Sequence, residues 1–331
     1  MREWKCGRRL AWLFAMGIAV GATAADAQER VKRIGLLFAG GEKQRDHLDK
    51  ALVESLAREG YVEGRNLVIE RRTAGGNFSI LPGHARELEA LKLDTVITTC
   101  TQSTLAMKDA TSTTPIVMAV VADPVGQGVV SSLRHPGSNI TGTSSQFEDI
   151  LPKMLEYLAT ALGRPARVAV LYNSESAVHA RLWKLVERQA PALQLRAFRV
   201  DVPKATAGLK PAFDAIAAQG ADALFPLPDD PFFFNRRQMI VDFAAAQRLP
   251  GVFFASEFVE AGGLLSYGES MTEGYRRAAG YVGKIARGAK PGDLPIEQPT
   301  RFELVVNKKT AAALGIVLPP ALLLRADRVI E

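Results

Sequence analysis

The chain has 331 residues, of which 47% are hydrophobic and 23% are charged. That balance is typical of a folded globular protein and excludes a disordered or fibrous chain. The formal charge of +6 is a weak excess. Because it includes no block of lysine and arginine, it argues against a nucleic-acid partner.

The N-terminal segment has the pattern of a secretory signal peptide. Four basic residues within the first nine precede an apolar run at residues 10–20, and the triplet Ala25, Asp26 and Ala27 follows. A basic start, a short apolar region and an A-x-A site are the three parts of a cleavable signal. The alternative, an uncleaved anchor, is disfavoured because the run is too short to span a bilayer. We therefore expect residues 1–27 to be removed and the protein to reach the periplasm.

The mature chain then has about 300 residues, enough for two ordinary domains. Cys6 leaves with the signal, so Cys100 has no partner for an internal disulfide. An exported chain with one thiol must rely on its hydrophobic cores. No cysteine follows the A-x-A site either, so a lipid-anchored N-terminus is not expected.

The first half of the mature chain alternates β-rich runs with amphipathic stretches. Leu48, Leu52 and Leu56, four residues apart, place one apolar face on a helix that Gly60 ends. The patterns predict strands at residues 33–38, 66–70, 94–99, 115–121 and 139–143. They predict helices at residues 43–59, 80–91, 102–110 and 126–133.

The second half repeats this alternation. Its predicted strands are residues 167–172, 195–200, 222–227 and 251–254. Its predicted helices are residues 177–190, 207–219 and 232–248. After these come a helix at 272–287, a stretch rich in proline and glycine at 288–299, and a last strand at 302–306.

Strands alternating with helices predict an α/β protein with parallel sheets and helices on both faces. Residues 93–123 and 221–257 share one plan of strand, polar loop, helix, strand and acidic loop. Seams fall near residues 144–150 and 262–270. We expect one lobe of residues 30–144 plus 268–296, and a second of 145–267 plus 297–331. A chain that crosses repeatedly between two such lobes predicts a hinge, with a ligand cleft at the carboxyl ends of the strands.

Small polar residues mark the end of the strand at 94–99. Thr99, Thr101, Gln102 and Ser103 stand where this strand gives way to a helix. Backbone N–H groups and hydroxyls at a helix N-terminus form a site for an anion such as a ligand carboxylate. The alternative is a cap that serves only its own helix. The position at a strand end favours the ligand.

Further polar loops follow other strands. Asp123 precedes Pro124, where it either starts a turn or accepts a hydrogen bond from a ligand N–H. Asn173, Glu175 and Ser176 follow the strand at 167–172 and either contact a ligand or, in the case of the serine, cap the next helix.

Two adjacent carboxylates, Asp229 and Asp230, follow the strand at 222–227. Such a pair attracts an ammonium or several hydroxyls. Asp230 could instead cap the helix that Pro231 opens, so Asp229 is the stronger candidate. Of the aromatic residues 232–234, one could stack on a ligand, although core packing suits most of them. Ser256 and Glu257 follow the last strand of this half and could close the site.

The sequence lacks the motifs of several other functions. No GxGxxG follows the first strand, and no GxxxxGK[ST] or GxSxG occurs. The four histidines are scattered without metal-ligand spacing, and we expect His179 to be a surface residue rather than a base. No cofactor, metal or catalytic residue is therefore expected.

Several segments, in order, resemble the ABC transporter substrate-binding protein family that includes tryptophan- and tyrosine-binding members. They cover essentially the whole mature chain and are residues 60–67, 114–117, 123–126, 135–142, 303–307, 314–316 and 324–327.

The resemblance implies a type I periplasmic-binding-protein fold with two Rossmann-like lobes, three hinge crossings and a ligand trapped between them. By position it implies ligand contacts from Thr143 and from the loop residues named above. It also implies a permease with its ATPase as partner. The loop at residues 39–43 departs from the pattern of the aromatic amino-acid binders, so tryptophan itself is not implied.

We therefore expect a monomeric, non-enzymatic solute-binding protein that closes on a small polar, carboxylate- or amino-acid-like ligand. One alternative is a binding protein that signals through a membrane receptor. Another is an exported enzyme on the same fold, against which the missing catalytic motifs weigh.

Overall fold

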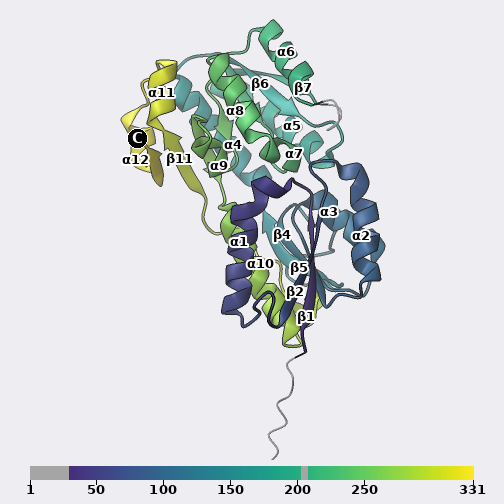
Figure 1. Cartoon of the computed structure of the whole chain (residues 1–331). Coiled ribbons are helices and arrows are strands. Elements are labelled where there is room, and N and C mark those ends of the chain that lie inside the picture. Colours follow the sequence, from purple (N-terminus) through teal and green to yellow (C-terminus); the bar gives the residue numbers. More distant parts are fainter. Residues whose placement is uncertain (1–29, 203–207) are drawn as a thin grey trace, which may run out of the picture. The chain divides into compact units, whose positions relative to one another are not determined.

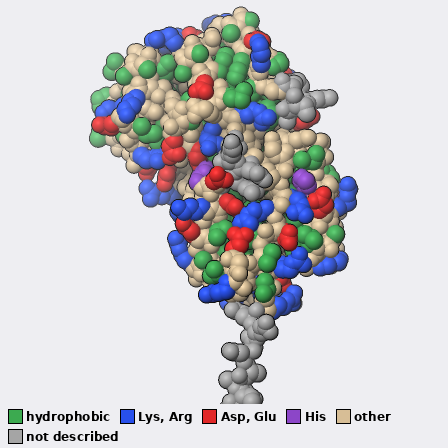
Figure 2. All heavy atoms as spheres, in the orientation of Figure 1, with side chains coloured by type: hydrophobic (Ala, Val, Ile, Leu, Met, Phe, Trp, Pro, Cys, Tyr) green, Lys and Arg blue, Asp and Glu red, His purple; other side chains and the backbone are tan. Residues whose placement is uncertain are grey.

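The computed structural model describes residues 30–202 and 208–331. The expected signal peptide at residues 1–27 lies outside these ranges. Within them, none of the helices combines the length and apolar character needed to cross a bilayer. On the face drawn in Figure 2, acidic and basic side chains are interspersed rather than gathered by sign.

The first sheet is parallel throughout, in the order β2-β1-β3-β4-β5. Apolar, β-branched runs form its central strands, which are buried because helices cover both faces. Its strands are β1 (Lys32–Phe38), β2 (Leu67–Thr73), β3 (Thr95–Thr98), β4 (Ile116–Ala122) and β5 (Ile140–Ser145).

Two pairs of helices flank the first sheet. Helix α1 lies beside α10 on one face, and α2 lies beside α3 on the other (Figure 1). The apolar stripe of α1, Leu48, Leu52 and Leu56, is fully buried, as its spacing predicted. The bounds are α1 (Glu42–Arg58), η1 (Phe78–Ile80), α2 (Leu81–Ala90), α3 (Thr101–Ala110) and α10 (Met271–Ala286).

The second half of the chain forms a parallel set β7-β6-β8 and a mixed set β12-β11-β10-β9. A bridge between Leu224 and Gly251 connects the two sets. Among the described strands of these two sets, only the β10–β11 pair runs antiparallel. The strands are β6 (Ala166–Tyr172), β7 (Leu195–Asp201), β8 (Ala223–Pro226), β9 (Val252–Phe253), β10 (Leu265–Gly268), β11 (Glu303–Asn307) and β12 (Arg328–Ile330).

Helices again pack against these strands. Helix α4 contacts α5, whereas α8 contacts both α7 and α9. The bounds are α4 (Phe147–Leu162), α5 (Ala177–Gln189), η2 (Ala190–Leu193), α6 (Lys210–Gln219), α7 (Pro231–Asn235), α8 (Arg237–Ala246), α9 (Ser256–Glu260), η4 (Pro291–Asp293), α11 (Lys308–Leu314) and α12 (Pro320–Arg325).

The chain passes between the two groups of strands three times. After β5 it enters α4, which packs on β9 and β10. After β10 it returns through α10, which packs on α1, β4 and β5. The third passage follows Glu297, which still bridges Thr143 of β5, and leads to β11. Carboxyl ends of strands from both groups therefore face a common region.

Two predicted helices are wrong in detail. Residues 126–133 form turns rather than a helix, because Pro124 directs a turn and Gly128 adopts a left-handed φ of 67°. Residues 232–248 form two helices, α7 and α8, which meet at Arg236 with a non-helical φ of −104° and ψ of 18°. The sequence patterns also left α4, α9, α11, α12, β10 and β12 unassigned.

Candidate ligand-binding site

A cavity of about 40 Å³ lies between strand ends of the two groups. Both halves of the chain line it, together with residues from the two passages through α4 and α10. Its volume is below the range of about 300–1,000 Å³ that is usual for small-ligand pockets. Five aromatic rings dominate the lining, from Phe38, Phe147, Phe234, Phe254 and Tyr275.

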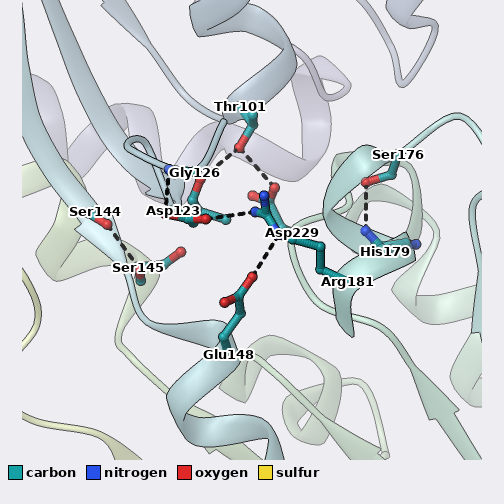
Figure 3. A network of polar contacts seen from close by, with 11 residues as sticks. Thr101, Asp123, Gly126, Ser144, Ser145, Glu148, Ser176, His179, Arg181 and Asp229 are labelled. Carbon is teal, nitrogen blue, oxygen red and sulfur yellow. Dashed lines mark hydrogen bonds and ion pairs between the residues drawn. The ribbon is translucent and has the colours of Figure 1, made fainter. Parts of the chain in front are cut away.

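Asp229 brings a carboxylate into this aromatic lining. Its backbone adopts a left-handed φ of 62°, and its side chain is 6% exposed. Thr101 Oγ1 donates to Asp229 Oδ2 at 3.0 Å, which joins the start of α3 to the loop after β8 (Figure 3). Burial, with a smaller contribution from neighbouring Asp230, raises the pKa of Asp229 to about 8. The carboxyl group is therefore protonated at neutral pH in the ligand-free protein, and a ligand cation beside it would favour the ionised form.

Asp230 serves its own helix, the alternative that the sequence left open. Its Oδ1 accepts from the backbone N–H groups of Phe232 and Phe233, and Pro231 occupies the first turn of α7. Its Oδ2 accepts from Asn173 Nδ2 at 2.9 Å. Burial raises the pKa of Asp230 to about 6. Asn173 and Asp230 thereby connect the loops after β6 and β8.

His179 is not the surface residue that we expected. It is fully buried, with its ring 5.8 Å from that of Phe233 and 5.8 Å from that of Tyr172. Its Nδ1 accepts from the Asn173 N–H at 2.9 Å, so Nε2 carries the proton and donates to the Pro228 carbonyl at 2.9 Å. Burial lowers the pKa of His179 to about 3. A neutral histidine therefore holds the loop that precedes Asp229.

The polar residues at the start of α3 have mixed roles. Ser103 Oγ accepts from the N–H groups of Thr99 and Cys100, so it caps its own helix. Thr99 and Cys100 line the cavity. Burial raises the pKa of the free Cys100 thiol to about 12. Gln102 Oε1 is buried, with no hydrogen-bond partner among the residues that the structure describes.

Asp123 lies at a second cavity of about 150 Å³, which shares Phe147 with the first. Asp123 Oδ1 accepts from the Gly126 N–H at 2.8 Å, the turn interaction that the sequence offered as an alternative. Asp123 Oδ2 pairs with Arg181 at 2.9 Å, and Arg181 Nε donates to Glu148 at 2.9 Å (Figure 3). Arg181 also lies near Asp229 (Figure 3), and its charge partly offsets the rise in the pKa of that carboxyl group.

The remaining predicted site residues lie around the cavities or away from them. Glu257 pairs with His47 of α1 at 3.0 Å, while Ser256 begins α9. Ser176 Oγ accepts from the His179 N–H and caps α5, the alternative that the sequence left open. Glu175 is exposed.

Thr143 contributes through the backbone of β4. Its Oγ1 accepts from the Val120 N–H at 3.0 Å, inside an irregularity where the register between β4 and β5 shifts. Val120 adopts a φ of 59°, an outlier for a β-branched residue, and lines the cavity. Thr143 thus fixes one wall of the cavity rather than lining it.

Asn235, at the end of α7, was not singled out in the sequence. It lines the cavity, and both atoms of its amide are shielded from solvent. Neither has a hydrogen-bond partner within the described ranges. An asparagine at a helix end is typical of a cap, so no sequence pattern distinguished this one.

Known protein structures share the fold that carries these cavities. A structure from Streptococcus pneumoniae described as an ABC domain in complex with L-Trp is 25% identical, with a TM-score of 0.82 over 90% of this chain and 99% of that one. A conserved domain protein from Vibrio cholerae is 28% identical, with a TM-score of 0.83 over 91% and 100%. A periplasmic ribose ABC transporter structure from Conexibacter woesei is 14% identical, with a TM-score of 0.53 over 87% and 96%, and shows the fold alone. The predicted α/β fold of the type I periplasmic-binding-protein class is confirmed.

The model of the family described as "ABC transporter substrate binding protein" matches residues 40–330. The chain belongs to this family, whose members are non-catalytic solute-binding proteins of ABC transporters. A relative described as "Tyrosine-binding protein" from Clostridioides difficile is 24% identical over 293 residues, which cover 87% of this chain and 82% of the relative.

Proposed function

We propose that the protein captures an α-amino acid with a large apolar or aromatic side chain. The observation that carries this proposal is the placement of buried Asp229 at a cavity lined by five aromatic rings. The rings suit an apolar ligand body, and the carboxylate suits an ammonium. The relatives described as binding tyrosine and L-Trp support the same ligand class.

Capture would involve closure of two lobes, residues 30–144 plus 268–296 and residues 145–267 plus 297–331. The three passages of the chain would then form the hinge. A ligand favours the closed state only through contacts that the open state lacks. Thr101 and Asp229, which hydrogen-bond directly, would belong to opposite lobes, so closure would also bring this pair together. The signal peptide at residues 1–27 would direct export to the periplasm and be cleaved, and the mature protein would hand the ligand to a permease with its ATPase.

A thermal-shift and calorimetry panel tests the ligand class. L-phenylalanine, L-tyrosine, L-tryptophan and L-leucine are compared with L-glutamate, L-lysine and ribose. Because a ligand that binds only the folded state stabilises it by mass action, we expect the first group to raise the melting temperature and the second to leave it unchanged. Asp229→Asn should weaken binding of the best amino acid by about 1–3 kcal/mol, since the ammonium loses a charged acceptor. A response to ribose alone would contradict the proposal.

A further inference from the structure

The Asn235 amide is the least satisfied polar group of the aromatic cavity. Its nitrogen and oxygen are both buried there without a hydrogen-bond partner in the described part of the chain. A buried amide normally has partners, because leaving a donor or acceptor unpaired destabilises the fold. Its burial without them indicates that a further molecule supplies the missing hydrogen bonds.

Gly40 explains how the amide reaches this position. A Cβ built on Gly40 would lie 2.6 Å from Asn235 Oδ1 and 2.7 Å from Nδ2. No side chain larger than hydrogen therefore fits at residue 40 while the amide stays in place. Gly40 belongs to the loop after β1 and Asn235 to α7 of the other group of strands, so the two halves of the chain meet at this contact.

The chemistry of the amide restricts the ligand. Its NH₂ group needs an acceptor and its oxygen needs a donor, side by side. Asp229 lines the same cavity and supplies only an acceptor when it is ionised. A polar group with acceptor and donor together is found in the carboxylate and ammonium of an α-amino acid or in a carboxamide. A monocarboxylate or a simple amine carries only one of them.

We propose that Asn235, held against Gly40, determines specificity by pairing with a ligand end that carries a donor beside an acceptor. This inference rests on the proposed function for its probes. According to this inference, the Asn235 amide is the group that distinguishes an amino acid from its deaminated or decarboxylated analogue.

The first experiment needs no ligand. Asn235→Leu replaces the amide by an apolar group of similar size, so the unliganded variant should melt at the same temperature as the parent or higher. Asn66→Leu is the matched control, because the Asn66 side chain accepts from the Val62 N–H and donates to the Gly60 carbonyl. It should melt lower. If Asn235→Leu lowers the melting temperature as Asn66→Leu does, the amide is structural and the inference is overturned.

The second experiment measures discrimination by calorimetry with L-phenylalanine, L-phenylalaninamide, 3-phenylpropanoate and 2-phenylethylamine. The parent should prefer the first two over the last two. Asn235→Leu should lose about 10- to 100-fold in affinity for L-phenylalanine and bind all four within a few-fold of one another. Retained preference in the variant overturns the inference. If none of the four binds the parent, the proposed ligand class fails, and the ligand-free melting experiment still decides whether the amide is unpaired.

Gly40→Ala provides a third measurement, since its Cβ would displace the amide. The single variants and the double variant form a cycle. We expect Gly40→Ala to weaken L-phenylalanine binding in the parent and to have little further effect when Asn235 is already leucine. Fully multiplicative losses would show that the two residues act independently, which contradicts the proposed pairing.

Discussion

At the residue scale, the candidate site depends on how buried polar groups are satisfied. Asp230, Ser103, Ser176 and His179 all have partners in the fold itself, through caps or through loop carbonyls. Asp229 has one hydroxyl, from Thr101, and a raised pKa. A group that the fold leaves incompletely satisfied is the one with most to gain from a ligand.

The raised pKa of Asp229 predicts a pH-dependent stability of the ligand-free protein. Above about pH 4 the unfolded chain loses this proton, whereas the folded chain keeps it up to about pH 8. The unfolded state then binds fewer protons, so this residue lowers the free energy of unfolding as pH rises from 4 to 8. Asparagine has no proton to lose. We therefore expect the melting temperature of Asp229→Asn to exceed that of the parent by more at pH 8 than at pH 4.

Thermal unfolding of both proteins at pH 4, 6 and 8 measures this difference. His179, whose low pKa acts in the opposite direction at acidic pH, is present in both proteins and therefore cancels. A difference in melting temperature that stays constant with pH would show that the pKa of Asp229 is not raised in the folded state.

At the element scale, strand β4 and helix α10 meet closely behind the cavity. Val120 in β4 keeps a left-handed φ of 59°, a conformation that destabilises a β-branched residue by about 1–3 kcal/mol. Its side chain faces Gly274 of α10, where a Cβ would lie 2.2 Å from Val120 Cγ2. The cavity wall is therefore shaped by a helix glycine that the passage through α10 brings into place.

This contact predicts opposite effects of alanine at two glycines of the same helix. Gly274→Ala should destabilise the fold by about 1–3 kcal/mol through overpacking, and it should weaken ligand binding because Val120 lines the cavity. Gly280→Ala is the control, since a Cβ at that position would have no neighbour within 4 Å, and it should stabilise by up to about 1 kcal/mol through helix propensity. Denaturant unfolding of both variants measures these changes. Equal stabilisation by both would contradict the close contact.

Periodicity predicted the repeating elements of this fold because they have strong local signals. Strands such as β1, β4 and β6 are continuous apolar runs, and α1 and α5 carry regular apolar stripes. Helix α4 was missed because its Pro152 is a helix breaker by local rules, yet the helix buries eight residues, including Leu151 and Met154, and tertiary packing outweighs the proline. Short elements such as α9 and β12 carry too few residues for a period to appear.

The site was predictable only in its outline. Strand ends followed by polar residues pointed to Asp229, Asp123 and the start of α3, and these lie at the two cavities because parallel strands bring their carboxyl ends together. Which of these residues cap a helix and which face the cavity depends on side-chain direction, which spacing does not contain. Asn235 and the burial of His179 depend on contacts between the loop after β8 and distant segments, so local sequence gave no signal for them.

At the scale of the whole molecule, Arg181 connects segments on either side of the cavities. It lies on α5, pairs with Asp123 in the loop after β4, and also pairs with Glu148 on α4. Glu257 of α9 and His47 of α1 form a second link of the same kind. Arg181 with Asp123, and Glu257 with His47, would join the two proposed lobes, and an opening of those lobes would break both pairs.

Arg181 should therefore influence closure more than folding. Its side chain is 34% exposed, and such ion pairs contribute only about 0–1 kcal/mol to stability. We expect Arg181→Met to leave the unfolding midpoint nearly unchanged and to weaken binding of the best amino acid about 2- to 10-fold, mainly by faster dissociation, since the closed state loses a contact that the open state never had.

Arg164→Met is the matched control, because Arg164 pairs with Asp222 at 3.0 Å within one proposed lobe. It should change neither affinity nor dissociation rate. Small-angle scattering adds a structural readout, since ligand should reduce the radius of gyration of each protein. The parent and the control should contract at a lower ligand concentration than Arg181→Met does. The contrary result is that both arginine variants bind like the parent and contract at the same ligand concentration. The ion pair between Arg181 and Asp123 would then have no influence on closure. The contacts that hold the lobes together would lie at Thr101, Asp229 and the ligand itself.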